Sequence, residues 1–203
     1  PSFLPSFLPS FSLSLFLSFF LSFSLAFLST NLEPAMKLQL CLFLFTTMFA
    51  VVASQSSRYV ATNGIDSSNN CLNTSAPCAT ISRAVNQANA GDVIMIFHGT
   101  YQAAATIGVN KSLTFITASD MPDVIINAPS SGTIFEITSA DVSFNSIEIN
   151  GTGAGSSCVV ISSNSTVNLT GLYIHNCFSY SGGAISVVAS SVLTAVNCTF
   201  TSN

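Results

Sequence analysis

VSFNSIEI at residues 142–149 opens a pattern that two later stretches repeat, VNLTGLYI at 167–174 and VLTAV at 192–196. The first residue of each stretch is a valine, and these valines are spaced by 25 and 25 positions (167 − 142 and 192 − 167). Within each stretch apolar or β-branched residues alternate with polar ones, which is typical of short β-strands. Recurrence at a fixed spacing indicates a repeat architecture, in which each unit stacks on the next.

Further strand patterns precede and separate these stretches: VIMIF at 93–97, LTFIT at 113–117, IFEIT at 134–138, VVIS at 159–162 and AISVV at 184–188. A β-sandwich would show hairpin turns roughly every 8–12 residues and would pair strands that are neighbours in sequence. A solenoid instead repeats the same strand once per coil. The recurrence therefore predicts an all-β parallel β-helix with coils of about 20–25 residues. Asparagines in NGTGAG (150–155), HNCFS (175–179) and VNCTF (196–200) are expected at corresponding coil ends, where stacked amides can hydrogen-bond between coils.

A solenoid exposes its core at its ends unless a cap covers them. The segment ATISRAVNQANAGD at 79–92 carries an apolar stripe with helical spacing, made of Ile81, Ala84, Val85 and Ala88. It predicts a capping helix at about 80–90, with Thr80 as N-cap and Gly91 at C′. No comparable cap precedes Asn203, which falls inside the repeat pattern, so we expect a β-helix that is truncated at its C-terminus.

The composition excludes several functional classes. Charged residues make up 6% of the 203 residues, with 4 Lys+Arg against 8 Asp+Glu, and 49% are hydrophobic. Such a chain is not of the disordered type. Four basic residues cannot form the basic surface that nucleic-acid binding requires, so no nucleic-acid partner is expected. Oligomeric state is left open.

The N-terminal part of the chain differs from the rest. Residues 1–25 contain only Pro, Ser, Phe and Leu, all of which pyrimidine codons can encode. We interpret residues 1–35 as a translated upstream tract; the alternative is a membrane span at 11–28. From Met36, one Lys, an apolar run and small residues at Val51 and Ala53 predict a secretory signal peptide at 36–53; the alternative is an uncleaved signal anchor. Residues 54–203 are then the secreted β-helix domain, without a membrane span.

Cysteine placement agrees with an oxidising compartment. Cys71 and Cys78 bracket a short turn-rich loop and predict a disulfide. Cys158, Cys177 and Cys198 are interpreted as small buried core residues, although two of them could pair across adjacent coils. No C-x2-C pair or histidine cluster accompanies them, His98 and His175 being isolated, so neither a metal nor another cofactor is expected. Six N-x-S/T sequons mark candidate glycosylation sites: Asn73, Asn110, Asn150, Asn164, Asn168 and Asn197.

The run at 59–101, from YVATNG through the helix to GDVIMIFHGTY, resembles the N-terminal entry of right-handed parallel β-helix proteins of the pectin-lyase-like superfamily. The resemblance implies a right-handed solenoid. Two short motifs also resemble the GGA[ILV] and FxxN repeat of polymorphic outer membrane proteins, known from chlamydial surface adhesins. They are Gly182-Gly183-Ala184-Ile185 and Phe200-Thr201-Ser202-Asn203. We expect these residues to build coils rather than to bind a ligand.

These features predict a secreted or cell-surface β-helix that acts in adhesion or glycan binding and has no catalytic residues in this part of the chain. Its expected partners are glycans or cell-surface molecules. The alternative is a polysaccharide lyase or hydrolase whose active site lies in further coils, since many proteins of this superfamily cleave acidic polysaccharides. Such enzymes use Ca²⁺-binding or paired carboxylates. Asp120 with Asp123, and Glu136 with Asp141, are the candidates that this alternative offers. A purely structural coat component is a third possibility.

Overall fold

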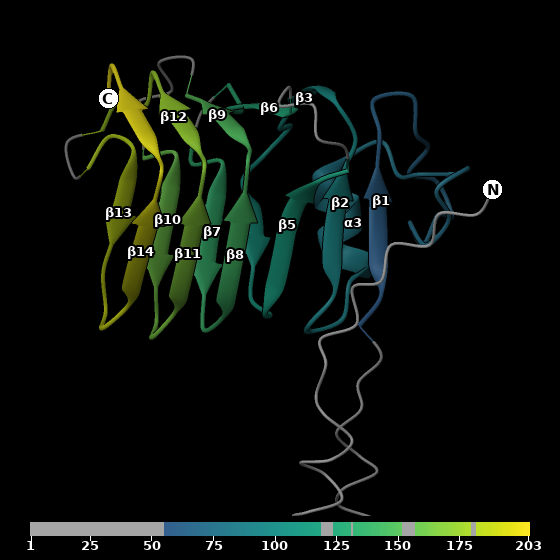
Figure 1. The fold of residues 1–203 in the computed structure, drawn as a ribbon, viewed down its shortest axis with the longest axis horizontal. Helices are drawn as coiled ribbons and strands as arrows, with labels where there is room; N and C mark the ends of the chain where they lie inside the picture. The colour runs from purple at the N-terminus through teal and green to yellow at the C-terminus, as the bar shows by residue number, and fades with distance from the viewer. Residues whose placement is uncertain (1–54, 119–123, 131, 152–156, 180–181) are drawn as a thin grey trace, which may run out of the picture. The chain divides into compact units, whose positions relative to one another are not determined.

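The computed structural model describes residues 55–118, 124–130, 132–151, 157–179 and 182–203. They form the expected right-handed parallel β-helix, in which every strand-to-strand pairing of the three sheets is parallel (Figure 1). The expectations for residues 1–35 and 36–53, and for Asp120 and Asp123, fall outside the described residues. No helix in the described ranges is long and apolar enough to cross a membrane.

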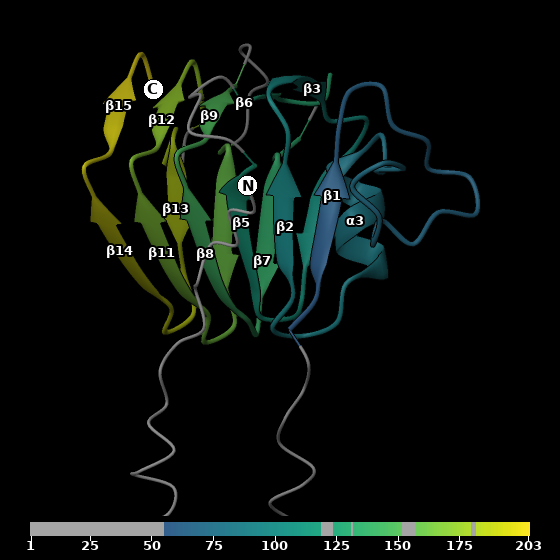
Figure 2. The same ribbon diagram turned by 45° about the vertical axis from the view of Figure 1, so that its right-hand side comes forward.

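Each coil contributes one strand to each of three sheets, which run along the solenoid (Figures 1 and 2). The first sheet has six strands: β1 (Ser57–Val60), β2 (Val93–Ile96), β5 (Leu113–Thr117), β8 (Asp141–Asn145), β11 (Thr166–Thr170) and β14 (Val192–Val196). The second has five: β3 (Gly99–Gln102), β6 (Val124–Asn127), β9 (Glu148–Asn150), β12 (Tyr173–His175) and β15 (Thr199–Thr201). The third has four: β4 (Ile107–Val109), β7 (Phe135–Thr138), β10 (Val159–Ser162) and β13 (Ile185–Val187).

The core consists of inward side chains that stack from coil to coil. Phe115 and Phe144 lie opposite each other on β5 and β8, with ring centroids 4.7 Å apart and nearly parallel planes. Phe135 of the third sheet meets both edge-on, at 5.5 and 5.0 Å. All three rings are fully buried. Offset-stacked and edge-to-face pairs are the favoured aromatic geometries, so these rings tie the first and third sheets together.

The 25-residue period holds for one step and then shifts by one residue. Val142 pairs with Val167, and both are buried, but Val167 pairs with Leu193 while Val192 points outward and is 56% exposed. The connection from the second to the third sheet is one residue longer in the later coil: the interval is 9 from Asn150 to Val159 (159 − 150) and 10 from the paired His175 to Ile185 (185 − 175). Because side chains alternate along a strand, a shift of one residue turns the expected inward valine outward.

The capping helix α3 (Ile81–Gln87) forms where the sequence predicts it, and its apolar stripe is buried. Thr80 is the N-cap, and its Oγ1 accepts from the Arg83 amide at 3.1 Å. The expected role of Gly91 is wrong, since the helix ends earlier, at the C-cap Ala88. Lys111 Nζ donates to the carbonyls of Val85 and Ala88 at 3.2 and 2.9 Å. This ammonium group supplies the end of the helix with the hydrogen bonds that a glycine cap would otherwise provide.

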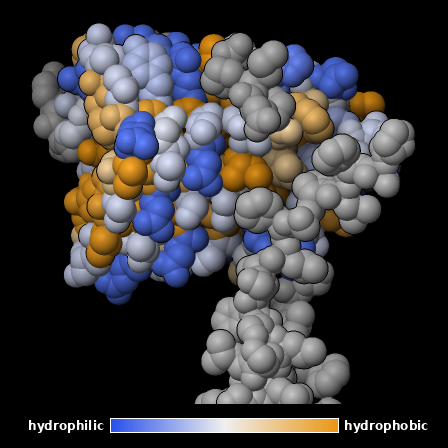
Figure 3. Space-filling model, in the orientation of Figure 1, coloured by the Kyte–Doolittle hydropathy of each residue, from blue (hydrophilic) through white to orange (hydrophobic). Residues whose placement is uncertain are grey.

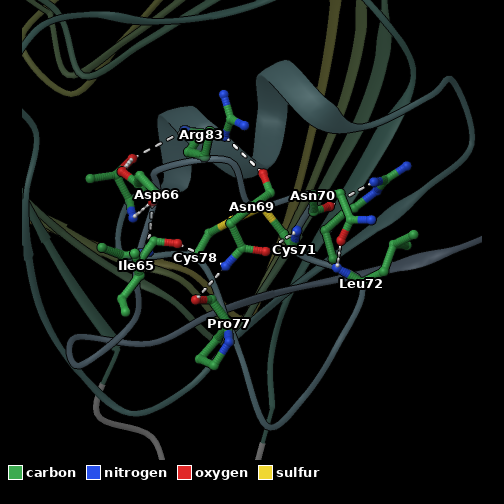
Figure 4. The surroundings of a disulfide bond; sticks show 12 residues. Ile65, Asp66, Asn69, Asn70, Cys71, Leu72, Pro77, Cys78 and Arg83 are labelled. Atoms are coloured by element: carbon green, nitrogen blue, oxygen red, sulfur yellow. Dashed lines mark hydrogen bonds between the residues drawn. A yellow bond between two sulfur atoms is a disulfide. The ribbon is translucent and has the colours of Figure 1, made fainter.

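Before α3, a loop is closed by the Cys71–Cys78 disulfide, whose Cα atoms are 5.1 Å apart (Figure 4). The Asn69 amide group lies inside this loop and donates to the carbonyls of Ile65, Ala76 and Pro77. Asp66 accepts from the amides of Ala79 and Thr80 at 2.7 and 3.1 Å. These side-chain hydrogen bonds add to the backbone bonds that join both ends of the loop to Tyr59, from the Tyr59 amide to the Cys71 carbonyl and from the Cys78 amide to the Tyr59 carbonyl.

Candidate functional site

The outward face of the second sheet carries two parallel columns of side chains, which we call the sheet-two face. Strand register places Glu148, Tyr173 and Thr199 in one column. The other column contains Gln102, Asn127, Asn150, His175 and Thr201. Because strands of successive coils lie about 4.8 Å apart, side chains in one column are direct neighbours.

Tyr173 presents its ring on this face and is 39% exposed. The ring stacks on His175, two residues along the strand, with centroids 4.6 Å apart and planes inclined by 18°. Thr201 Oγ1 donates to the Tyr173 hydroxyl at 3.0 Å. The tyrosine is thus held on two sides while part of its surface remains open to a ligand.

Glu148 and His175 are joined by a 3.0 Å contact between Oε1 and Nε2, with 29% and 15% of their side chains exposed. The Asn176 amide nitrogen lies 2.8 Å from Nδ1 of the same ring. An amide NH₂ group can only donate, so Nδ1 accepts and Nε2 carries the hydrogen that points to Glu148. Both ring nitrogens of His175 are therefore engaged within the protein.

A ladder of amides continues the second column toward earlier coils. Asn176 Nδ2 donates to Asn150 Oδ1 at 3.1 Å, and Asn150 Nδ2 donates to Asn127 Oδ1 at 3.1 Å. Gln102 Nε2 donates to the Ala128 carbonyl. Asn150 and Asn176 thus lie at coil ends as expected, whereas the expectation for Asn197 is wrong. Asn197 lies in the turn between the first and second sheets, with φ of 53°.

Chemically, this face offers a partly exposed aromatic ring beside one carboxylate and several amide groups. Such an arrangement can pack against an apolar surface that carries hydroxyls and can accept hydrogen bonds from them. The engaged ring nitrogens of His175 offer no free base. The hydrogen bonds among these side chains set their orientation.

The residues of the two repeat motifs lie against each other where one coil meets the next, and one of them, Thr201, also belongs to the sheet-two face. A Cβ at Gly183 would come within 2.4 Å of the Cys177 carbonyl oxygen and 2.9 Å of the Asn203 carbonyl carbon. Asn203 Oδ1 accepts from the Cys177 amide, and its Nδ2 donates to the Ile174 carbonyl, both at 3.0 Å. Phe200 pairs with the buried Ile174. Their contacts are those of coil stacking. The remaining members, Gly182, Ala184 and Ile185, lead into β13.

The sequons differ in what surrounds them. Asn150 is half-buried and its nitrogen donates within the amide ladder. The other five are exposed, on the first sheet or in loops and turns: Asn73, Asn110, Asn164, Asn168 and Asn197. A glycan attached to any of these five would not start from the sheet-two face, since none lies on a strand of that sheet.

Cys158 and Cys177 are buried in the core as expected, and the pairing that the sequence left open is found between these two, whereas Cys198 is not fully buried. Cys158 and Cys177 form a disulfide, with Cα atoms 5.6 Å apart, and Cys198 is a free, half-buried thiol. The paired cysteines are 19 positions apart in the sequence, which is less than the 25 positions of one coil (167 − 142). Cys158 immediately precedes β10 and Cys177 follows β12 by two residues, so both lie in connections from the second to the third sheet, in neighbouring coils. Sequence spacing alone did not specify which two of the three would meet.

Of the carboxylates that the enzymatic alternative offers, the structure describes Glu136 and Asp141, which lie on different sheets. Glu136 is exposed on β7 of the third sheet, and Asp141 is exposed on β8 of the first. The described residues contain no group of three or more His, Cys, Asp or Glu side chains that could hold a metal ion.

Sequence reasoning missed Glu148, Tyr173 and His175 as a group. A signal for them was present, because Glu148 and Tyr173 are the seventh residues of VSFNSIEI and VNLTGLYI. Aligning those two repeats places the carboxylate beside the ring, and His175 follows two residues later on the same face.

A family described as "Protein of unknown function (DUF1565)" matches residues 62–203. Among solved structures, a rhamnogalacturonan lyase is similar at 15% identity and a TM-score of 0.45, with 70% of this chain and 56% of the lyase chain covered. The chain thus spans little more than half of the lyase chain that it matches. No curated protein matches this sequence. In the view of Figure 3, hydrophilic and hydrophobic residues are interspersed over the surface of the described coils. Hydropathy therefore does not single out a binding surface in this view, whereas the strand register and the side-chain contacts define the sheet-two face.

Proposed function

This chain belongs to the DUF1565 family, and on that premise we propose that its β-helix binds glycans through the sheet-two face. The observation that carries the proposal is the partly exposed ring of Tyr173, held between His175 and Thr201 and next to Glu148. A sugar ring has apolar C–H faces and a rim of hydroxyls. It can pack on a tyrosine while its hydroxyls donate to a neighbouring carboxylate.

The second feature that supports binding is the order of the surrounding groups. Tyr173, His175 and the amide ladder are held by hydrogen bonds and ring stacking on paired strands. Side chains that are already ordered lose less conformational freedom when a ligand arrives. The face runs along the solenoid, so an extended oligosaccharide could contact several coils at once.

We place this binding outside the cell, as a secreted or surface-displayed protein. The two disulfides support an oxidising compartment, because such bonds are rare in the reducing cytosol. The expected signal peptide at 36–53 and the exposed sequons agree with the same location.

The arrangement of the sheet-two face favours binding over cleavage. Hydrolysis of a glycosidic bond commonly uses two carboxyl groups roughly 5–10 Å apart. In the described strands of the second sheet, Glu148 is the one carboxylate. A lyase needs a free base, and both nitrogens of His175 are engaged.

The test is a glycan array probed with the purified full chain, followed by calorimetry with oligosaccharides that bind. Binding at micromolar strength that falls at least tenfold in Tyr173→Ala is the expected result. Tyr59→Ala is the matched control, since Tyr59 is a half-buried, outward tyrosine on β1 of the first sheet. Absence of binding to every glycan, or equal losses in the two variants, would contradict the proposal.

A further inference from the structure

The described strands of the second sheet carry one carboxylate, Glu148, and no lysine or arginine. We infer that this face selects neutral, hydroxyl-bearing oligosaccharides and rejects chains of uronic acids; the inference rests on the glycan binding proposed above.

The cations of the described residues are held away from the sheet-two face. They are Arg58, Arg83 and Lys111. Arg58 is buried in an ion pair with Asp92, and Lys111 donates to carbonyls at the end of α3. Arg83, on α3, donates through Nε to the Asn69 carbonyl at 3.0 Å. All three are therefore occupied around the capping helix and its loop.

Recognition of a uronate requires a partner for its carboxylate. Proteins commonly supply one as an arginine fork or a lysine. On the sheet-two face the group beside Tyr173 is instead Glu148, which is directly opposite it in the register. A uronate packed on this ring would bring two carboxylates close together, and like charges at an interface oppose binding.

A neutral sugar meets complementary groups at the same place. The Glu148 carboxylate is partly exposed and can accept from sugar hydroxyls in addition to the hydrogen bond from His175. The Tyr173 hydroxyl accepts from Thr201, so its own hydrogen is directed elsewhere and can be donated to a ligand oxygen. The Glu148 carboxylate can therefore accept hydrogen bonds from two neighbouring sugar hydroxyls, and the Tyr173 hydroxyl can donate to a sugar ring oxygen.

The experiment compares oligogalacturonate with the same oligomer after its carboxylates have been reduced to primary alcohols. The two ligands share length and linkage and differ only at C6, which carries a carboxylate in one and a neutral primary alcohol in the other. Affinities for the full chain are measured at low ionic strength, where repulsion between charges is screened least. A panel of neutral and uronate oligosaccharides of other linkages is measured in parallel. We expect the neutral member of each bound pair to bind at least tenfold more tightly.

Two variants separate charge from shape. Glu148→Gln should weaken neutral ligands about tenfold, because a neutral amide accepts less strongly than a carboxylate. The same substitution should also reduce the difference in affinity between each uronate oligomer and its neutral, reduced counterpart. Glu136→Gln is the matched control, since Glu136 is exposed on the third sheet, and it should leave both affinities unchanged.

The outcomes are distinguishable. Tyr173-dependent binding of neutral oligosaccharides over uronates supports the inference. Tyr173-dependent binding that prefers uronates overturns it and leaves the proposed glycan binding intact. Failure to bind either kind, or binding that Tyr173→Ala does not change, removes both.

Discussion

Arg58 and Asp92 form an ion pair inside the β-helix, with Nη2 and Nε both 3.0 Å from Oδ2. Asp92 is 1% exposed and also accepts from the amides of Ser56 and Asn89 at 3.0 and 2.9 Å. Arg58 Nη1 donates to the Asn70 carbonyl at 2.8 Å. The pair thus links the first strand, the disulfide loop and the segment after the capping helix.

Asp92→Asn should destabilise the fold by about 3–5 kcal/mol, because it leaves the buried Arg58 guanidinium without its counter-charge. Urea unfolding followed by circular dichroism measures the difference. Asp141→Asn is the control, since Asp141 is exposed on β8, and it should change the free energy of unfolding by less than about 0.5 kcal/mol. Equal effects of the two substitutions would show that the buried pair contributes little.

Stability should fall in acid through the same carboxylate. Burial opposes its ionisation, but hydrogen bonds from the Asn89 and Ser56 amides and from Arg58 outweigh it and hold the pKa of Asp92 below its ordinary value of 3.8. The unfolded chain therefore takes up this proton more readily, so the contribution of Asp92 is present above pH 3.8 and is lost as the pH falls through the folded-state pKa. Melting temperatures measured from neutral pH downward should show a smaller acid loss in Asp92→Asn than in the wild type.

Gly183→Ala should destabilise the chain by about 1–3 kcal/mol, because the added methyl group meets the backbone of Cys177 and Asn203. Gly108→Ala provides the matched control: Gly108 lies on β4, and an added Cβ there meets nothing within 4 Å. Thermal unfolding of the two variants tests the close approach. A Gly183→Ala variant as stable as Gly108→Ala would contradict the packing described.

Removal of the Cys158–Cys177 disulfide should cost about 2–4 kcal/mol, since this bond closes a loop of 19 positions and so restricts the unfolded chain. The double substitution Cys158→Ala with Cys177→Ala avoids leaving a lone thiol, and denaturant unfolding measures the loss. Cys198→Ala removes the thiol that is free in the structure and should have a much smaller effect. If reducing agent changes the stability of the double variant as much as that of the wild type, the contribution of this disulfide is small.

The repeat pattern predicted the fold because inward side chains must recur once per coil to stack. The helical stripe from Ile81 to Ala88 located the cap because apolar residues at helical spacing form one buried face. The register of the last coil could not be predicted from valine spacing, because one extra residue in a connection leaves the alternation unchanged and turns Val192 outward. The helix end depended on Lys111, a residue distant in sequence that replaced the expected glycine cap.

The sheet-two face was harder to predict than the fold. No local sequence motif marks Glu148, Tyr173 or His175. They form a group because Glu148 on β9 lies beside Tyr173 and His175 on β12, the paired strand of the next coil. The pairing of Cys158 with Cys177 has the same origin, because it depends on where a winding returns. Alignment of the repeats with each other, rather than a search for local motifs, would have recovered the first group.

The extra residue in the connection between the second and third sheets has a consequence for how such a protein can evolve. That insertion is accommodated while the strands on either side remain paired with the previous coil. The connections between the second and third sheets can therefore vary in length and composition with little effect on strand pairing. Each added coil, in contrast, would add one more strand to the sheet-two face. Selection could thus change the length of this face and the composition of the connections independently.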